Sequence, residues 1–228
     1  MKTNKLKITA LSLALIFATA SILSSCKTAS KTQKGAGIGA IAGGALGALI
    51  GKKAGNTAVG ALIGGAIGGT AGAFIGRKMD RQAKELETAI PGAEVTSTGE
   101  GILVKFDSGI LFAFGKAELT TTAKQNIDNL AASLNKYPNT NIMVIGHTDA
   151  IGGDAVNNKL SMERASSVRT YAAAKGVDFS RLKIAGKGKN EPIASNETED
   201  DRAKNRRVEI VITANEKMKA EAKSEAAN

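Results

Sequence analysis

Cysteine, histidine and aromatic residues are nearly missing from this chain. Its 228 residues include one cysteine, one histidine and no tryptophan, and aromatic residues make up 4%. A single cysteine cannot form a disulfide within the chain. One histidine, without clustered cysteines or an HExxH spacing, argues against a zinc site, so no metal is expected.

A catalytic constellation is also missing. Ser161 could be imagined as the nucleophile of a hydrolase with His147, the one histidine, but no nucleophile-elbow pattern surrounds it. The more economical interpretation of His147 is a structural hydrogen-bonding residue. The sequence therefore predicts a protein that is not an enzyme and that uses no cofactor.

Positive charge is concentrated near the beginning of the chain. The net charge is +10, and residues 26–84 carry nine Lys or Arg against one acidic residue. Residues 85–228 carry nineteen Lys or Arg against twenty acidic residues. A nucleic-acid-binding domain would need a basic folded face interleaved with aromatic residues, so nucleic acid is not an expected partner. A cationic flank is better suited to anionic lipid or peptidoglycan.

Residues 1–25 have the pattern of a secretory signal peptide, in which lysines precede an apolar run. The run ends in Leu-Ser-Ser-Cys, which resembles the lipobox of bacterial lipoproteins. That resemblance implies that Cys26 carries the lipid and becomes the mature N-terminus. It also implies outer-membrane placement, because Lys27 stands where an aspartate would favour retention in the inner membrane. Residues 26–34 would be the lipidated tether, with the C-terminal domain in the periplasm.

Residues 35–76 form a glycine-rich segment that two lysines, Lys52 and Lys53, interrupt. Glycines recur every four residues at 39, 43, 47, 51 and 55, and again at 60, 64, 68, 72 and 76. A period of four places them in one stripe along a helix, which lets two helices approach closely. The segment resembles the glycine zippers of outer-membrane lipoproteins and predicts a helical hairpin in or against a membrane. A flexible linker and a hairpin that packs on itself outside the bilayer remain the alternatives.

The rest of the chain predicts one compact domain between two flanking segments. A charged, partly helical linker is expected at 77–99, and a charged tail of frayed helix or disorder at 214–228. Between them, apolar periodicity predicts strands at 101–106, 110–114, 142–145, 182–185 and 208–213, with helices at 121–136 and 160–176. This order predicts an α/β (α+β) sandwich, with helices packed on one sheet.

The candidate site follows the strand at 142–145, where a polar, glycine-rich loop leads into a helix. Helical periodicity places Arg164 within the apolar face of that helix, near its first turn, where the dipole disfavours a cation. An arginine in that place needs an anionic partner. One interpretation is a salt bridge to Asp149, Asp154 or another carboxylate. The other is a guanidinium held ready for a ligand carboxylate.

The segments GHTDAIGGDAVNNKLSMERA and NRRVEIVI make a family resemblance specific. Residues 100–213 resemble the OmpA-like peptidoglycan-binding domain shared with Pal and MotB. The resemblance implies a mixed β-sheet with helices on one face, and a ligand in the diaminopimelate of the peptidoglycan stem peptide. By position, Asp149 would bind the ammonium of the ligand and Arg164 its carboxylate. The residues implied to line or border the pocket are Thr148, Asn157, Leu160, Ser161, Arg206 and Arg207.

The chain departs from the family at Ala113 and Gly115, where acidic or asparagine side chains are usual. The expected function is a non-catalytic lipoprotein that tethers the outer membrane to peptidoglycan, with lipid bound through Cys26. The alternative is a membrane-active glycine zipper that associates with itself as a channel or scaffold. In that case the OmpA-like domain would only position the zipper.

Overall fold

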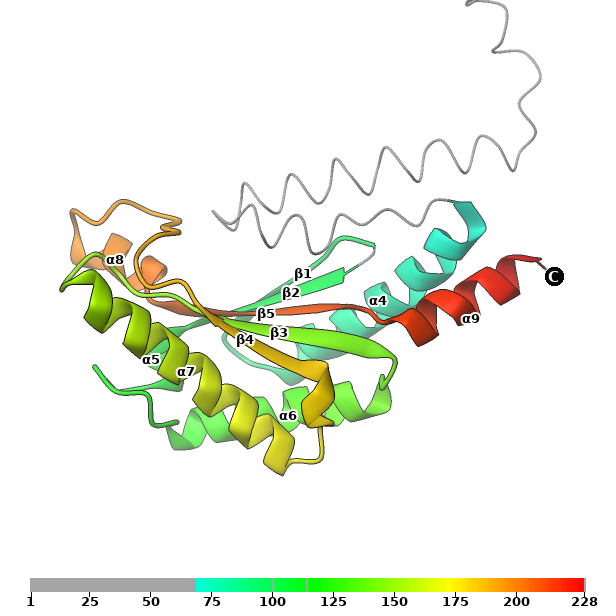
Figure 1. Cartoon of the computed structure of the whole chain (residues 1–228), viewed down its shortest axis with the longest axis horizontal. Helices are drawn as coiled ribbons and strands as arrows, with labels where there is room; N and C mark the ends of the chain where they lie inside the picture. Colours follow the sequence, from blue (N-terminus) through cyan, green and yellow to red (C-terminus); the bar gives the residue numbers. More distant parts are fainter. Residues whose placement is uncertain (1–68, 100, 114, 228) are drawn as a thin grey trace, which may run out of the picture.

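The computed structural model describes residues 69–99, 101–113 and 115–227 (Figure 1). The predicted signal peptide, the tether with Cys26 and most of the glycine zipper lie outside the described residues. None of the helices that the structure describes combines the length and the apolar character needed to cross a membrane.

The sheet is mixed, as the family resemblance implied, and has five strands, of which the first was not predicted. They are β1 (Ala93–Ser97), β2 (Gly101–Asp107), β3 (Thr140–Gly146), β4 (Leu182–Gly186) and β5 (Arg207–Ala214), in the order β1-β2-β5-β3-β4. Only the β3/β4 pair is parallel, and β5 lies antiparallel between β2 and β3. This order brings the end of β3 and the start of β5 together, because Gly146 pairs with Val208.

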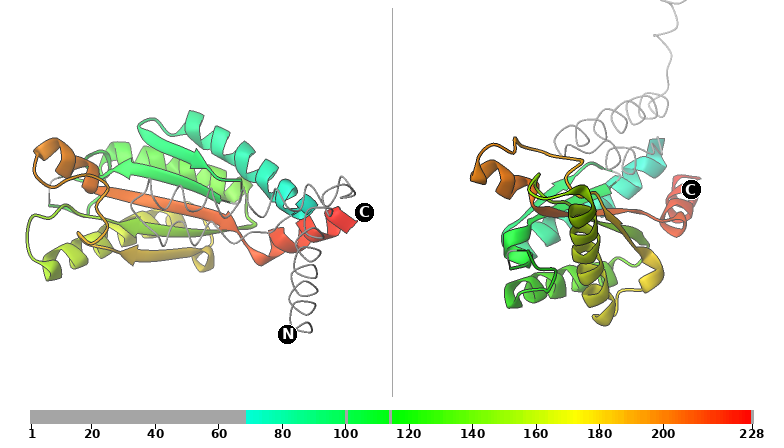
Figure 2. Two further views of the ribbon diagram at one scale, coloured as in Figure 1. Left: turned by 90° about the horizontal axis from the view of Figure 1, so that it is seen from above. Right: turned by 60° about the vertical axis from the view of Figure 1, so that its left-hand side comes forward.

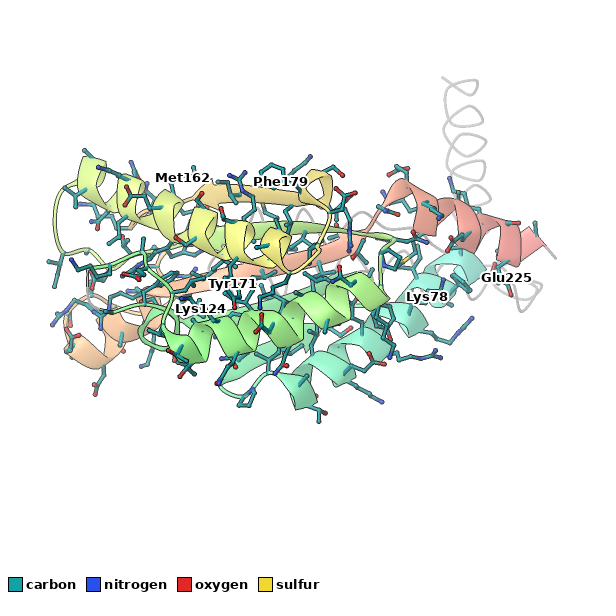
Figure 3. All side chains as sticks on the ribbon, turned by 90° about the horizontal axis from the view of Figure 1, so that it is seen from below. Lys78, Lys124, Met162, Tyr171, Phe179 and Glu225 are labelled. Carbon is teal, nitrogen blue, oxygen red and sulfur yellow. The ribbon has the colours of Figure 1, made fainter. Side chains whose placement is uncertain are left out.

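Three long helices cover one face of the sheet, which confirms the predicted architecture. Figure 3 shows α4 (Gly69–Ala89), α6 (Thr121–Lys136) and α7 (Asp154–Ala174) side by side on that face. Alternate residues of the strands, such as Val104, Val144 and Ile210, point into the core beneath these helices. Their neighbours Leu103, Ile145 and Val211 form a smaller apolar cluster on the opposite face.

The segment predicted as a linker, residues 77–99, is instead part of the folded domain. Ile75, Met79 and Leu86 recur at helical spacing in α4 and lie in the main core, while charged side chains between them face solvent. β1 then pairs along its whole length with β2. The last residues of the predicted zipper, up to residue 76, lie in the same helix, because α4 begins at Gly69.

The strand predicted at 110–114 does not form over its described residues, 110–113. The short helix α5 (Ser108–Leu111) occupies this place, and Phe112 then makes an isolated bridge to Leu119. Gly115 has a φ of 66°, which turns the chain away from an extended path. A short apolar run is compatible with either a strand or a buried turn of helix. In the folded domain it packs as a turn of helix, with Leu111 buried.

Helix α7 begins at Asp154, six residues earlier than the predicted start at Leu160. Its first turns carry no apolar stripe, since Val156 is exposed and the buried residue there is the polar Asn157, so apolar periodicity does not reveal them. Asp154 is well placed for the helix dipole. The helix ends as predicted, with Gly176 at a φ of 89°. Two glycines let α7 lie close on the sheet. A Cβ at Gly146 would overlap the Ser161 carbonyl, and one at Gly186 would lie 2.7 Å from the Met162 nitrogen.

The C-terminal tail is an ordered helix rather than frayed or disordered chain. α9 (Glu216–Ala227) buries Met218 and Ala222, and its Glu221 accepts hydrogen bonds from Lys78 of α4 and Asn139. Figure 1 shows α9 packed beside α4 at one end of the sheet. The remaining elements are a 3₁₀ turn, η1 (Phe179–Arg181), and α8 (Glu199–Asn205).

If α4 is part of the cooperative unit, Leu86→Ala should lower the free energy of unfolding by about 2–5 kcal/mol, because it leaves a cavity in the core. Glu87→Ala, at an exposed position of the same helix, should change it little. Urea denaturation of the two variants and the wild type measures both effects. Equal stabilities for the two variants would contradict the inclusion of α4 in the domain core.

Candidate functional site

A cavity of about 630 Å³ lies at the end of the sheet where β2 and β3 lead into α5 and α7. Figure 2 shows α8, in orange, and the start of α7 at that end, away from the C-terminus. The cavity has a polar, deeply buried part and an apolar mouth. It is lined by Asp107, Ser108, Gly109, Phe112, Ala113, Gly115, Thr148, Asp149, Ile151, Gly152, Val156, Asn157, Leu160, Arg164, Ala203 and Arg206.

Asp149 lies in the cavity wall with both carboxylate oxygens engaged. Its Oδ1 accepts a hydrogen bond from the Ile151 backbone N–H at 3.0 Å, and its Oδ2 accepts one from Arg206 Nη1 at 2.7 Å. Asn157 Nδ2 donates to the Ile151 carbonyl at 3.0 Å and to the Gly152 carbonyl at 3.4 Å. These bonds hold the loop between β3 and α7 in a defined shape, so the carboxylate has a fixed position.

Arg164 is 3% exposed and lies in the middle of α7, well past the turns on which the helix dipole acts. Its Nε donates to the Lys116 carbonyl at 3.0 Å, and its guanidinium lies 5.2 Å from the centre of the Phe112 ring. Burial lowers the pKa of Arg164, the nearby Arg206 lowers it further, and Asp149 acts in the opposite direction. The guanidinium still keeps its charge at neutral pH.

The salt-bridge interpretation of Arg164 is wrong for the residues that the structure describes. Asp149 pairs with Arg206, and Asp154 pairs with Lys189 at 3.0 Å. No described carboxylate lies within ion-pair distance of Arg164. The buried cation therefore lines the cavity without an anionic partner in the described part of the chain, which is the arrangement expected for a carboxylate-binding group.

Arg206 ties the cavity wall to α8. Its two terminal nitrogens lie 2.7 Å from Asp149 Oδ2 and 2.7 Å from Glu199 Oε1. Partial burial acts to lower the pKa of Arg206, but the bonds to the two carboxylates outweigh it and the pKa is raised. Because Asp149 has already a cationic partner, a ligand ammonium would share the carboxylate with Arg206.

The structure brings together most of the predicted site residues. Thr148, Asp149, Asn157, Leu160 and Arg164 all line the cavity, as does Arg206. The buried Thr148 hydroxyl has no hydrogen-bond partner among the described residues. An unsatisfied buried hydroxyl costs about 1–3 kcal/mol, and a ligand or water in the cavity could relieve that cost.

Ser161 and Arg207 do not reach the cavity. Ser161 Oγ donates to the Asn158 carbonyl and accepts from the Gly188 N–H, which fastens α7 to the turn after β4. Arg207 is fully buried, and its Nε lies 2.7 Å from Glu209 Oε1. Since Val208 faces the helices, its neighbours Arg207 and Glu209 face the other side of the sheet.

Sequence patterns missed several lining residues. The strand predicted at 110–114 gives no reason to place Asp107, Ser108 and Phe112 in a binding site. Ile151 and Val156 were hidden in a stretch interpreted as a polar loop, although an isoleucine between polar residues was a visible signal. The two positions of family departure, Ala113 and Gly115, do lie in the cavity wall.

His147 lies beneath the site as a structural residue. It is fully buried, its backbone N–H donates to the Arg207 carbonyl at 2.9 Å, and its Nε2 lies 3.5 Å from Glu209 Oε2. Burial lowers the pKa of His147, so the ring is neutral at pH 7. Neither ring nitrogen has a hydrogen-bond partner among the described residues, so the side chain itself lacks the hydrogen bonds expected of it.

A second hollow, of about 650 Å³, lies between α6 and α7 and is lined by Lys124, Glu163 and Tyr171 among others. It contains none of the predicted site residues. No group of three potential metal ligands occurs in the part of the chain that the structure describes.

Comparison with known proteins identifies the region around the cavity. Residues 111–206 match the OmpA family, and residues 1–80 match the YMGG-like Gly-zipper family. Residues 111–206, which contain most of the cavity wall, are therefore similar to the OmpA family. OmpA-family proteins are structural and not enzymatic, which agrees, for this part of the chain, with the prediction of a non-catalytic protein.

Named relatives support this assignment. The chain is 37% identical to the probable lipoprotein YiaD of Escherichia coli K12 over 61% of its length, and 43% identical to outer membrane protein A of Bordetella avium over 50%. These matches span 64% and 59% of the two relatives, which is less than two thirds of either.

A solved structure shares the fold of the OmpA-family domain. The cell wall anchor of the T6SS from Pseudomonas aeruginosa superimposes with a TM-score of 0.52 and is 28% identical. The alignment covers 60% of this chain and 96% of the anchor.

The buried pair beneath the OmpA-family site allows a test of stability. Burial acts to raise the pKa of Glu209, but His147 and the charge of Arg207 outweigh it, and the pKa is lowered. A lowered carboxyl pKa stabilises the fold above the unfolded value of about 4.3. This stabilisation is lost as pH falls through the folded value. Glu209→Gln should therefore lower the free energy of unfolding at pH 7 by about 3–5 kcal/mol, because Arg207 loses its buried carboxylate.

The deficit of Glu209→Gln should shrink as the pH falls below the unfolded value and through the lowered folded pKa of Glu209, because the wild-type carboxylate is then protonated as well. Glu216→Gln, which removes an exposed pair with Lys219, should change stability little at any pH. Denaturant unfolding between pH 3 and pH 7 measures both. A Glu209→Gln deficit that does not depend on pH would contradict a role for the charged pair.

Proposed function

We propose that this protein is a non-catalytic outer-membrane lipoprotein that tethers the membrane to the cell wall. The cavity binds the diaminopimelate of a peptidoglycan stem peptide without forming a covalent bond. The observation that carries this proposal is the buried Arg164 guanidinium, which lines the cavity without a carboxylate partner among the described residues.

The two ends of an amino-acid headgroup match the charges of the cavity. Its carboxylate pairs with the planar guanidinium of Arg164, which can donate two parallel hydrogen bonds. Its ammonium approaches Asp149, whose carboxylate is held by the Ile151 N–H and by Arg206. Thr148 supplies a hydroxyl that has no partner among the described residues. Diaminopimelate presents one cation and one anion on the same carbon, so this arrangement is its electrostatic complement.

The names of the similar proteins agree with a tether. The superimposed structure from Pseudomonas aeruginosa is a cell wall anchor, one relative is a probable lipoprotein and another is an outer membrane protein. The membrane attachment proposed here uses lipid on Cys26, with the glycine-zipper segment beside it. Self-association through the zipper is the second candidate function, and the YMGG-like match over residues 1–80 favours it. A detergent-stable oligomer that persists after deletion of residues 100–228 would support that second role.

The tether is tested by co-sedimentation of the detergent-solubilised full chain with purified sacculi. Asp149→Ala and Arg164→Ala should each lose most of the pelleted protein, because removal of one partner of a buried charge pair weakens binding by about 2–5 kcal/mol.

Matched controls come from outside the cavity. Asp154 pairs with Lys189, and Arg169 stacks on Phe179. Asp154→Ala and Arg169→Ala should pellet like the wild type, and circular dichroism should show all four variants folded. Wild-type pelleting by both Asp149→Ala and Arg164→Ala would overturn the proposed site.

A further inference from the structure

Two exposed apolar side chains border the cavity. Large apolar residues are exposed at four positions of the described chain, which are Ile151, Val156, Met162 and Phe179. Ile151 is 60% exposed and Val156 is 64% exposed, and both line the cavity. These two residues are called the apolar lip. Single exposed apolar residues are ordinary, but a pair on the rim of one cavity points to a contact surface.

The backbone holds the apolar lip in place. The Ile151 N–H donates to Asp149, its carbonyl accepts from Asn157, and Gly152 takes the turn at a φ of 91°. Val156 lies in the first turn of α7. Neither side chain can withdraw from water by a movement of a loose loop, so burial by a ligand would be favourable.

The charged residues expected to bind the ligand, Asp149 and Arg164, are buried in the cavity wall, whereas the apolar lip is exposed at the mouth of the cavity. Thr148, Asp149 and Arg164 are each at most 7% exposed. The lip lies outside them, and Ala113, which stands where the family usually has a polar side chain, is exposed in the same wall. The volume of about 630 Å³ belongs to the range of sites for whole small molecules, so it leaves space beyond one amino-acid headgroup.

We propose that the apolar lip is a second subsite, which contacts the methyl group of the alanine that follows diaminopimelate in the stem peptide. The buried charged residues bind the amino-acid headgroup of diaminopimelate. The rest of the stem peptide then passes between Ile151 and Val156 at the mouth of the cavity. The domain then distinguishes a stem peptide that keeps this alanine from one that has lost it. This inference rests on the proposed function.

The test compares two stem peptides that differ by one residue. Isothermal titration calorimetry of the detergent-solubilised full chain uses L-Ala-γ-D-Glu-diaminopimelyl-glycine and the same peptide with D-Ala in place of the glycine, so that the two ligands carry the same charges and differ by one methyl group. The wild type should bind the D-Ala peptide about fourfold more tightly, which is the effect of burying one methyl group. Ile151→Ser and Val156→Ser should bring the ratio of the two affinities close to one. Met162→Ser, at an exposed position of α7 outside the cavity, should keep the wild-type ratio.

The outcomes separate this inference from the proposed function. A wild-type ratio of one, or an unchanged ratio in both lip variants, overturns the second subsite. In that case the proposed function stands if Asp149→Ala still abolishes binding of the glycine peptide. A wild type that binds neither peptide overturns both proposals.

Discussion

The Arg164 guanidinium is buried in the wall of a cavity, and no described carboxylate forms an ion pair with it. Asp149 acts on its charge without contacting it, because the Asp149 carboxylate is bound by Arg206, which also binds Glu199. A buried cation without a local anion is costly, and that cost is relieved when a ligand supplies the missing carboxylate. The proposed recognition of an amino-acid headgroup depends on this imbalance.

The packing around Arg164 fixes the position of its side chain, so the guanidinium cannot move to pair with a carboxylate of the described chain. Close packing of α7 over Gly146 and Gly186 fixes the helix that carries the arginine. The buried pair of Arg207 and Glu209, on the other side of β5, anchors the strand that follows Arg206. Side chains that the resemblance assigned to the pocket, Ser161 and Arg207, therefore support the site from behind and do not contact the cavity.

The same rigidity extends toward the glycine-rich segment. Residues matched by the zipper family end within α4, a helix whose Ile75 and Met79 belong to the core of the domain. Gly76, the last glycine of the fourfold repeat, lies against the turn between β1 and β2, where a Cβ would be 3.1 Å from the Gly99 carbonyl oxygen. The last two glycines of the repeat, Gly72 and Gly76, therefore lie in a helix that packs on the domain core.

Sequence periodicity by itself determined the elements whose pattern is local. The helix at 121–136, the strands at 142–145, 182–185 and 208–213, and the end of α7 at Gly176 follow from apolar spacing and capping residues. The family motifs also indicated Asp149 and Arg164. Tertiary structure decided which charges pair, because Asp149 and Arg206 are 57 positions apart and meet only where β5 lies beside β3. The tertiary structure also shows that residues 77–99 and the C-terminal tail belong to the domain. Their apolar side chains are few, and they become buried only because α4 and α9 pack together.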